Sequence, residues 1–303
     1  MSDVTSISRS LQGTSHVPVR NLFWRRALKR VLRDRLTLFA LFGLLIMALI
    51  CGLGPPIVEQ ALNIDSTRTS VAERYLPPSP THPLGTDNVG RDQLVRLLYG
   101  GRISLAIASV SSLLTIGIGV VSGLAAGYYG GTLDAALRWI ISTLESIPAF
   151  FLLIVVTTIW SPGPEALVVL LAFLGWSATA RLVRGEVLAL RERDYVLAAR
   201  ALGATGWRIM VSHLLPNLVP LIVVSLTINA GSLILVESGL SFLGLGVQPP
   251  TPTWGNMLTE ARAHFYRGTY LIVWPGIMIA LTVLFLYLVG DGLRDALDPR
   301  RQS

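Results

Sequence analysis

The sequence has few charged residues and almost no cysteine. Only 14% of its 303 residues are charged, whereas 52% are hydrophobic, and the mean hydropathy is +0.59. This composition is far more apolar than that of an ordinary soluble domain. The lone cysteine, Cys51, excludes an intramolecular disulfide and a thiolate metal cluster. The histidines lie on separate segments, at His16, His82, His213 and His264. We therefore expect a membrane protein without a metal site.

Lysine and the common catalytic motifs are also scarce. Lys29 is the only lysine, and no Gly-x-x-x-x-Gly precedes it, so the phosphate-binding loop of ATP-hydrolysing proteins is missing. The sequence contains no Gly-x-Ser-x-Gly elbow and no His-Glu-x-x-His pair, which removes the usual starting points for a hydrolase. We expect this chain not to be an enzyme and to bind no cofactor of its own.

Long charge-poor runs take up much of the chain. A helix needs roughly 20 apolar residues to cross the hydrocarbon core. Four runs without acidic or basic residues satisfy this requirement: Leu36–Val58, Ile103–Gly131, Leu214–Val236 and Tyr270–Gly290. Two further runs are weaker: Trp139–Trp160 contains Glu145, and Ala166–Ala180 is short and relies on the segment Ser161–Glu165 to reach across. The sequence thus predicts an all-α polytopic fold with six transmembrane helices.

The distribution of basic residues predicts the orientation. Lys and Arg near membrane spans are retained on the cytoplasmic side. With six spans, most of the 25 Lys and Arg residues fall on the side of the N-terminal tail, so both termini should be cytoplasmic. The predicted regions are a basic tail (1–35), the first span (36–58), an external loop (59–102), a core with five spans (103–290) and a C-terminal tail (291–303).

The net charge of +7 raises the question of a nucleic-acid partner. The basic residues, however, lie beside the ends of the spans and do not form a separate soluble face. Topology and contact with anionic membrane lipid explain them better. We therefore expect lipid as a partner and no nucleic acid.

The segment 181–216, between the fourth and fifth spans, carries too many arginines to lie in lipid. The fourth helix should continue to Leu190, and Asp194 should cap a short helix from Tyr195 to about Leu202. Gly203 suits the left-handed position after that helix, and Thr205 suits the cap of the next one. The short helix would lie across the cytoplasmic end and present small residues to a close partner. The alternative is an amphipathic helix that rests on lipid headgroups.

Two other groups of residues are candidates for function. Ionisable residues inside spans are costly and often mark a transport path, so the candidate translocation path comprises Glu145, Asn229, Ser232 and Glu237. Glu237 could instead lie at the outer interface, and Glu145 could pair with a basic residue.

Glycine and proline interrupt the segment from Glu237 to Trp254, so that we expect no continuous helix there. A re-entrant external gate formed by Gly244, Gly246, Pro249 and Pro250 is one interpretation, and a simple outer loop is the other. The proline-rich region from Glu59 to Arg102 should lie on the external surface. It would serve either as a rigid cap on the second span or as a surface that receives a binding protein.

The spacing in segment 181–216 also resembles a known motif. Ala198, Ala199 and Gly203, followed after nine residues by His213, Leu215 and Pro216, are similar to the EAA loop of permease subunits in bacterial ABC importers. Leu197 stands where the motif has glutamate, and His213 stands where isoleucine is usual. Peptide-type permeases also lack this glutamate, and they also have Arg-Asp-Tyr just upstream, which here is Arg193, Asp194 and Tyr195.

Three longer stretches narrow the resemblance to the C-type subunit of the dipeptide, oligopeptide and nickel permeases. They are HPLGTDNVGRDQLVRLLYGGRISLAIA (82–108), LSFLGLGVQPPTPTWGNML (240–258) and GDGLRDALDPR (290–300).

The resemblance implies the type I ABC importer permease fold in the bacterial cytoplasmic membrane. It further implies a homologous partner permease, an extracytoplasmic solute-binding protein, and two ATPase subunits that carry the ATP and Mg. The residues that would couple to the ATPases are Arg193, Asp194, Tyr195, Ala198, Ala199, Arg200, Gly203 and Ala204. Short peptides are the leading substrate, with nickel or another small solute as alternatives.

Rival classes remain open from the residues alone. A secondary transporter would need paired broken helices in matching halves, whereas this sequence has one broken region and no convincing repeat. A scaffold protein would not explain the polar interruptions of the spans.

Overall fold

The computed structural model describes residues 19–62, 64, 68–262, 266 and 268–298, and this part of the chain is helical, with one isolated bridge between Thr86 and Asp92. The helices are α2 (Val19–Val31), α3 (Arg35–Leu62), α4 (Gln93–Tyr129), α5 (Gly131–Glu145), α6 (Ala149–Ile159), α7 (Pro164–Leu190), α8 (Asp194–Ala201), α9 (Gly206–Ile209), α10 (Leu215–Phe242), α11 (Trp254–Arg262) and α12 (Tyr270–Leu297). A 3-10 turn, η1 (Val71–Glu73), precedes α4, and a π turn, η2 (Met210–Leu214), joins α9 to α10. Within the described residues, five helices are long and apolar enough to cross a membrane, or six if α5 and α6 form one broken span.

The all-α expectation is confirmed, and each predicted span corresponds to helix. The fourth helix enters at Pro164 and continues to Leu190, as expected. The third predicted span, Trp139–Trp160, is wrong as a single helix, because α5 and α6 meet at 71°. Pro148 precedes α6, and a proline inside a helix removes a backbone hydrogen bond and clashes with the preceding turn.

The expected break from Glu237 onward is also wrong in position. The helix α10 continues through Gly239 to Phe242, and the irregular segment begins only at Leu243. A single glycine lowers helix stability by about 1 kcal/mol, which tertiary packing readily offsets.

Helices α4 and α7 make the most extensive helix pair of the bundle. Three glycines one turn apart on α4 face three residues one turn apart on α7. A Cβ at Gly119 would lie 2.6 Å from Cβ of Thr179, and a Cβ at Gly127 would lie 2.8 Å from Cβ of Val187. Between them, Gly123 meets Val183. Small residues allow the backbones of membrane helices to approach closely, and this stripe therefore fixes α7 against α4.

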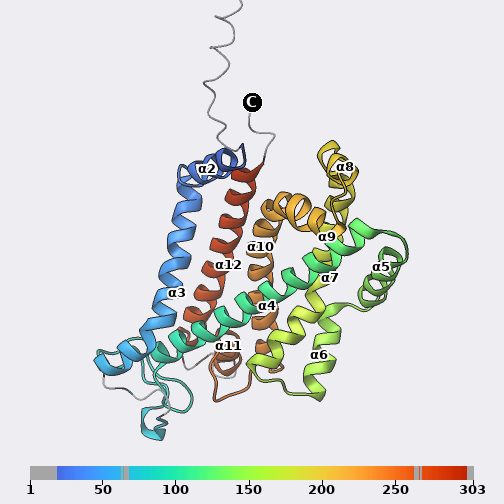
Figure 1. The fold of residues 1–303 in the computed structure, drawn as a ribbon. Coiled ribbons are helices and arrows are strands. Elements are labelled where there is room, and N and C mark those ends of the chain that lie inside the picture. The colour runs from blue at the N-terminus through green and yellow to red at the C-terminus, as the bar shows by residue number, and fades with distance from the viewer. Residues whose placement is uncertain (1–18, 63, 65–67, 263–265, 267, 299–303) are drawn as a thin grey trace, which may run out of the picture.

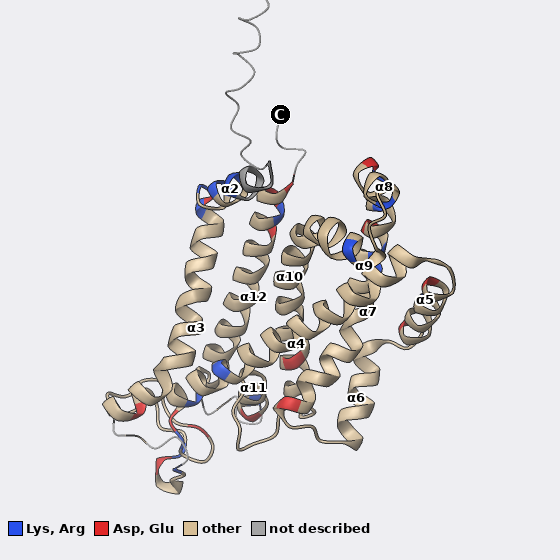
Figure 2. Cartoon of the chain, in the orientation of Figure 1, with Lys and Arg blue, Asp and Glu red and all other residues tan. Residues whose placement is uncertain are grey.

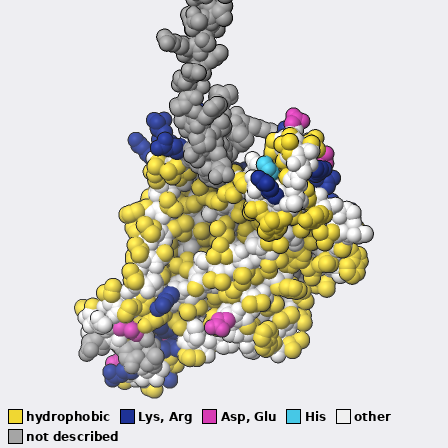
Figure 3. Space-filling view, viewed as in Figure 1, with side chains coloured by type: hydrophobic (Ala, Val, Ile, Leu, Met, Phe, Trp, Pro, Cys, Tyr) yellow, Lys and Arg dark blue, Asp and Glu magenta, His cyan; other side chains and the backbone are white. Residues whose placement is uncertain are grey.

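The charged residues lie mainly toward the two ends of the bundle (Figure 2). Hydrophobic side chains cover most of the face between them, and Lys and Arg gather over α2 and near α8 (Figure 3). Exposed apolar residues such as Phe39, Leu53 and Ile159 belong to this lipid-facing surface.

The two ends of the bundle carry different segments (Figure 1). Helices α2 and α8 and the end of α12 lie at one end, whereas α11 and the segment before α4 lie at the other. The segments predicted to share the cytoplasmic side thus lie together. We refer to these as the α8 end and the α11 end.

Candidate functional site: the α8 helix and the polar groups of the bundle

The helix α8 connects α7 to α9 and projects outward from this end of the bundle (Figure 1). Its N-cap is Arg193, with no side-chain cap hydrogen bond, and Asp194 is the first helical residue. The expectation that Asp194 caps the helix is therefore wrong by one position. Its carboxylate still lies in the first turn, where negative charge opposes the helix dipole favourably.

A glycine terminates α8 as expected. Gly203 has φ +82°, a conformation that costs glycine little and strains other residues. The Gly203 amide donates to the Arg200 carbonyl, and the Ala204 amide donates to the Ala199 carbonyl, each at 3.0 Å. These two bonds form a Schellman motif. A Cβ at Gly203 would have no heavy atom within 4 Å, so any substitution there acts through the backbone.

One side chain anchors α8 to the bundle. Val196 is 0% exposed, and it is the only buried residue of this helix. It belongs to a buried cluster with Val183 and Val187 of α7 and with Ile209 and Met210. Motion of α8 would therefore act on α7 and on the start of the α10 segment through this cluster.

Most other residues of α8 and its flanks are exposed, although Ala199 and Ala204 are half-buried. Leu202 is 88% exposed and Trp207 is 71% exposed, although this segment is predicted to lie outside the lipid. The Arg200 guanidinium lies 5.8 Å from the Tyr128 ring centroid. The Tyr195 and His213 ring centroids lie 6.4 Å apart. Partial burial raises the pKa of Tyr195, with Arg193 opposing this change and Glu186 adding to it.

Thr205 caps the following helix as predicted. Its hydroxyl accepts a hydrogen bond from the Arg208 amide at 3.4 Å. The helix α9 then leads through η2 into α10, so the segment from Gly206 to Phe242 runs as one long helical element.

At the opposite end, α10 stops with the same type of cap. Gly244 has φ +79°, the Gly244 amide donates to the Ser241 carbonyl, and the Leu245 amide donates to the Leu240 carbonyl. Gly246 is buried against Ser241, and a Cβ at Gly246 would lie 2.6 Å from the Ser241 Cα. Pro249 and Pro250 are exposed.

Glu237 is fully enclosed by this chain. It is 0% exposed, and its carboxylate accepts hydrogen bonds from Ser241 Oγ at 2.8 Å and Ser104 Oγ at 3.3 Å. The Ser104 hydroxyl also accepts from the Trp254 amide at 3.2 Å, while Trp254 Nε1 donates to the Leu97 carbonyl at 3.0 Å. Glu237 thus lies where α4, α10 and α11 meet.

An ion network fastens α11 to the start of α4. Arg91 Nε lies 2.7 Å from Asp87 Oδ2, and Arg96 Nη1 lies 2.8 Å from Glu260 Oε2. Arg96 also pairs with Asp87, and Arg91 with Glu260. Burial tends to raise the pKa of Asp87, but Arg96, the amides of Arg91 and Val89, and the Arg91 guanidinium outweigh burial and lower it.

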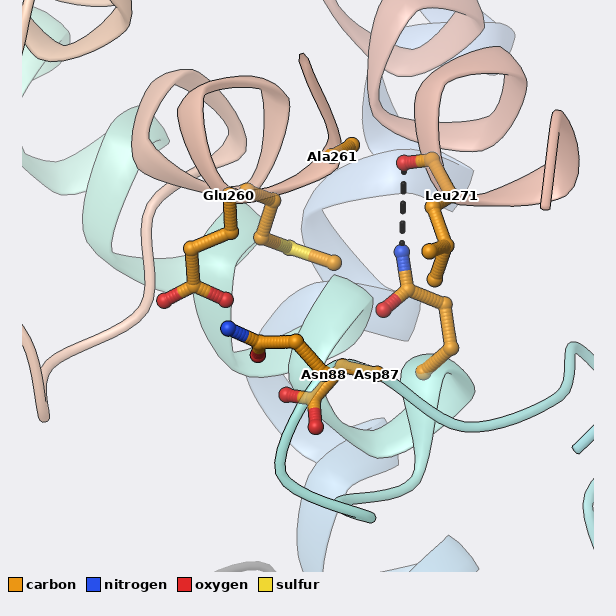
Figure 4. A pocket seen from close by; sticks show the side chains of 7 residues that line it. Asp87, Asn88, Glu260, Ala261 and Leu271 are labelled. Atoms are coloured by element: carbon orange, nitrogen blue, oxygen red, sulfur yellow. Dashed lines mark hydrogen bonds between the residues drawn. The ribbon is translucent and has the colours of Figure 1, made fainter. Parts of the chain in front are cut away.

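A small pocket of about 10 Å³ lies beside this network. That volume suits about one water molecule. Figure 4 shows Asn88 and Glu260 directed toward one another across it, while Gln93 Nε2 donates to the Leu271 carbonyl at 3.3 Å. The pocket is too small for a substrate.

The candidate path residues are not brought together. Glu145, at the end of α5, accepts from Ser177 Oγ at 3.2 Å and pairs with Arg181 of α7. On α10, Ser232 Oγ lies 3.2 Å from the Tyr287 hydroxyl. The amide oxygen of Asn229 is buried without a hydrogen-bond partner within the described residues. Glu145 borders an open groove.

The alternative that Glu145 pairs with a basic residue is confirmed by its ion pair with Arg181, but sequence reasoning missed the other charge pairs between helices. Asp134 of α5 accepts from Arg184 Nη2 at 2.8 Å, and the network of Asp87, Arg91, Arg96 and Glu260 joins segments far apart in the chain. The only signal was the presence of both signs near the span ends, and a single sequence does not say which charges meet.

Comparison with known proteins identifies the family. Residues 119–303 match the binding-protein-dependent transport system inner membrane component. Residues 23–78 match the N-terminal transmembrane domain of oligopeptide transport permease C. The chain belongs to this family of ABC importer permeases. It is a multi-pass inner membrane protein.

This permease is similar to curated relatives over nearly its whole length. It is 38% identical to the dipeptide transport system permease protein DppC of Bacillus subtilis over 90% of this chain and 85% of the relative. It is 41% identical to the glutathione transport system permease protein GsiD of Pectobacterium atrosepticum over 93% and 91%. The oligopeptide transport system permease protein OppC of Mycobacterium bovis is 35% identical over 91% and 94%.

The permease also resembles a solved structure. An inward-facing form of the MetNI methionine ABC transporter aligns with a TM-score of 0.54 and 25% identity, covering 67% of this chain and 96% of that one. A second crystal form gives a TM-score of 0.52. The type I permease fold expected from the resemblance is therefore confirmed.

Proposed function

We propose that this chain forms one half of the translocation pathway of an ABC importer for short peptides. The names of its relatives support a peptide substrate, since they include dipeptide, oligopeptide and glutathione permeases. A homologous partner permease would supply the other half, and an extracytoplasmic binding protein would deliver the substrate. Both termini and α8 would face the cytoplasm.

The observation that carries this proposal is the geometry of α8. The helix is held to the bundle by one buried side chain, Val196, and otherwise exposes its surface, including Leu202 at 88%. A surface of this kind suits a partner that covers it. Closure of two ATPase subunits, which carry the ATP and Mg, would move α8, and the Val196 cluster would pass that motion to α7 and α10.

Reconstitution tests the function. The chain, its partner permease, the two ATPases and the binding protein are placed in proteoliposomes, and uptake of labelled Ala-Ala is measured with and without ATP. We expect ATP-dependent uptake that competing peptides inhibit. Uptake of nickel or another solute without peptide uptake would contradict the substrate. Accumulation by this chain alone on a proton or sodium gradient would contradict the entire class.

Labelling tests the orientation. Single cysteines replace the exposed residues Arg200 and Gln248 in a Cys51→Ala background. A membrane-impermeant maleimide should label residue 200 only from the cytoplasmic side and residue 248 only from the outside. Labelling of both from one side would refute the topology.

A further inference from the structure

The break between α5 and α6 lies deep in the membrane. The helix α6 has 11 residues, and at 1.5 Å per residue it rises roughly 17 Å, about half of a hydrocarbon core of ~30 Å. Its far end leads into α7 at the α11 end of the bundle (Figure 1). Glu145, immediately before the break, is therefore near the middle of the membrane. Non-helical backbone at that depth requires a protein or water-filled surrounding.

A groove lies on α7 beside this bend. Toward the α11 end, Leu167 and Leu171 are buried in the same cluster as Leu153 of α6. Further along α7, beyond the 71° bend between α6 and α5, the helix borders a groove of about 640 Å³. The groove is lined by Glu145, Ala178, Arg181, Leu182, Gly185 and Glu186. The space beside Gly185 is open, since a Cβ there would have no heavy atom within 4 Å.

The charges in this groove are exposed and of both signs. The side chain of Arg181 is 58% exposed and that of Glu145 is 39% exposed, although the two form an ion pair. Ionisable groups at membrane depth that faced lipid would be costly. This side of α5 and α7 must therefore face water or another protein.

We propose that this groove binds the charged ends of a short peptide during its passage. Arg181 would hold the peptide carboxylate, and Glu145, assisted by Glu186, would hold the ammonium group. The inference rests on the proposed function and adds a site to it. It also selects Glu145 from the four candidate path residues.

The groove has the properties that such a ligand requires. The groove is open on one side, and Ala178 and Gly185 leave room for peptide side chains of different size. An ion pair that is largely exposed contributes little stability, so the Glu145–Arg181 pair is easily exchanged for the two ends of a peptide. Arginine suits the carboxylate because its planar guanidinium can donate two parallel hydrogen bonds.

The test is peptide protection of a cysteine in the groove. Ala178→Cys is made in the Cys51→Ala background and assembled with its partner subunits in inside-out vesicles. The rate of labelling by a small polar maleimide is then measured against Ala-Ala concentration. We expect labelling in the absence of peptide and protection by Ala-Ala. Alanylalanine amide, which lacks the carboxylate, should protect more weakly.

Substitutions assign the roles. In the Ala178→Cys protein, Arg181→Gln should raise the Ala-Ala concentration for half-protection by roughly tenfold, because a charge-assisted hydrogen bond is lost. It should also remove the difference between Ala-Ala and its amide. Arg181→Lys should restore part of that difference. The control is Arg138→Gln, because Arg138 is 60% exposed, pairs with Asp134 on the same helix, and does not line the groove.

The outcomes separate this inference from the proposed function. If the assembled wild-type importer takes up Ala-Ala but residue 178 is not labelled, the partner permease covers the groove and the inference is wrong. Labelling without protection, or protection that Arg181→Gln and Arg138→Gln change equally, also overturns it. If the assembled wild type imports no peptide, both proposals fall.

Discussion

The helices α8 and α11 differ in how they are attached. The residues of α11 that face the bundle are buried, including Trp254, Asn256 and Met257, and Arg91 and Arg96 hold Glu260 near its end. The helix α8 has a single buried residue, Val196, and no side-chain N-cap. At the α11 end, contacts within this chain therefore hold the helix in place, whereas α8 leaves most of its surface exposed.

Two tryptophans sharpen this comparison most. Trp254→Ala should destabilise the permease by roughly 3–5 kcal/mol, because a fully buried ring and its hydrogen bond to the Leu97 carbonyl are lost. Trp207, which is 71% exposed at the α8 end, is the matched control, and its alanine variant should change stability by no more than about 0.5 kcal/mol. Thermal unfolding of the purified protein in detergent measures both. Equal losses would mean that the two ends do not differ.

A substitution in the ion network should have a smaller effect. Arg96→Leu leaves Asp87 and Glu260 with Arg91 as their remaining basic partner, and we expect a loss of about 1–3 kcal/mol. Arg193→Leu at the exposed start of α8 is the control and should be nearly neutral. The same unfolding assay applies, and a neutral Arg96→Leu would show that the network does not hold α11.

The pH dependence of the network should be smaller still. Asp87 has a pKa lowered from 3.8, so its ionised form contributes stability that is fully present above pH 3.8 and is lost as the pH falls through the lowered value. Unfolding temperatures measured from pH 6 downward should stay level until that acidic region. The Asp87→Asn variant should lose less stability as the pH falls through this region, because it lacks the carboxylate that becomes protonated. The same dependence of unfolding temperature on pH in both proteins would show that Asp87 does not contribute to the acid sensitivity.

The sequence predicts the positions of the helices better than the contacts that hold them together. Long apolar runs specified the membrane helices, and the chemistry of Gly203 and Thr205 placed the end of α8 and the start of α9 to within a residue. Gly244 ends α10 in the same way as Gly203 ends α8, but the several glycines and prolines nearby gave no means of choosing which one stops the helix.

Contacts between segments that are distant in the sequence could not be predicted from the pattern of residue types. Glu237 reads as a polar interruption of a span, yet it is enclosed by hydroxyl groups from Ser104, Ser238 and Ser241. The pairing of Glu145 with Arg181 depends on the bend at Pro148, which turns α5 toward α7. A pattern of residue types shows that these groups need partners, and only the packed bundle shows which ones they have.

The central proposal is that α8 transmits motion from the ATPases to the bundle. The most direct test is the number of ATP molecules hydrolysed for each Ala-Ala imported. Gly203→Val should raise this number severalfold, because valine strains the left-handed position that ends α8 while meeting no neighbouring atom. Gly131→Val is the matched control, since Gly131 also has positive φ and open space around its Cβ but lies outside α8. The account predicts uncoupling for Gly203→Val and a wild-type ratio for Gly131→Val. A wild-type ratio for Gly203→Val would contradict it.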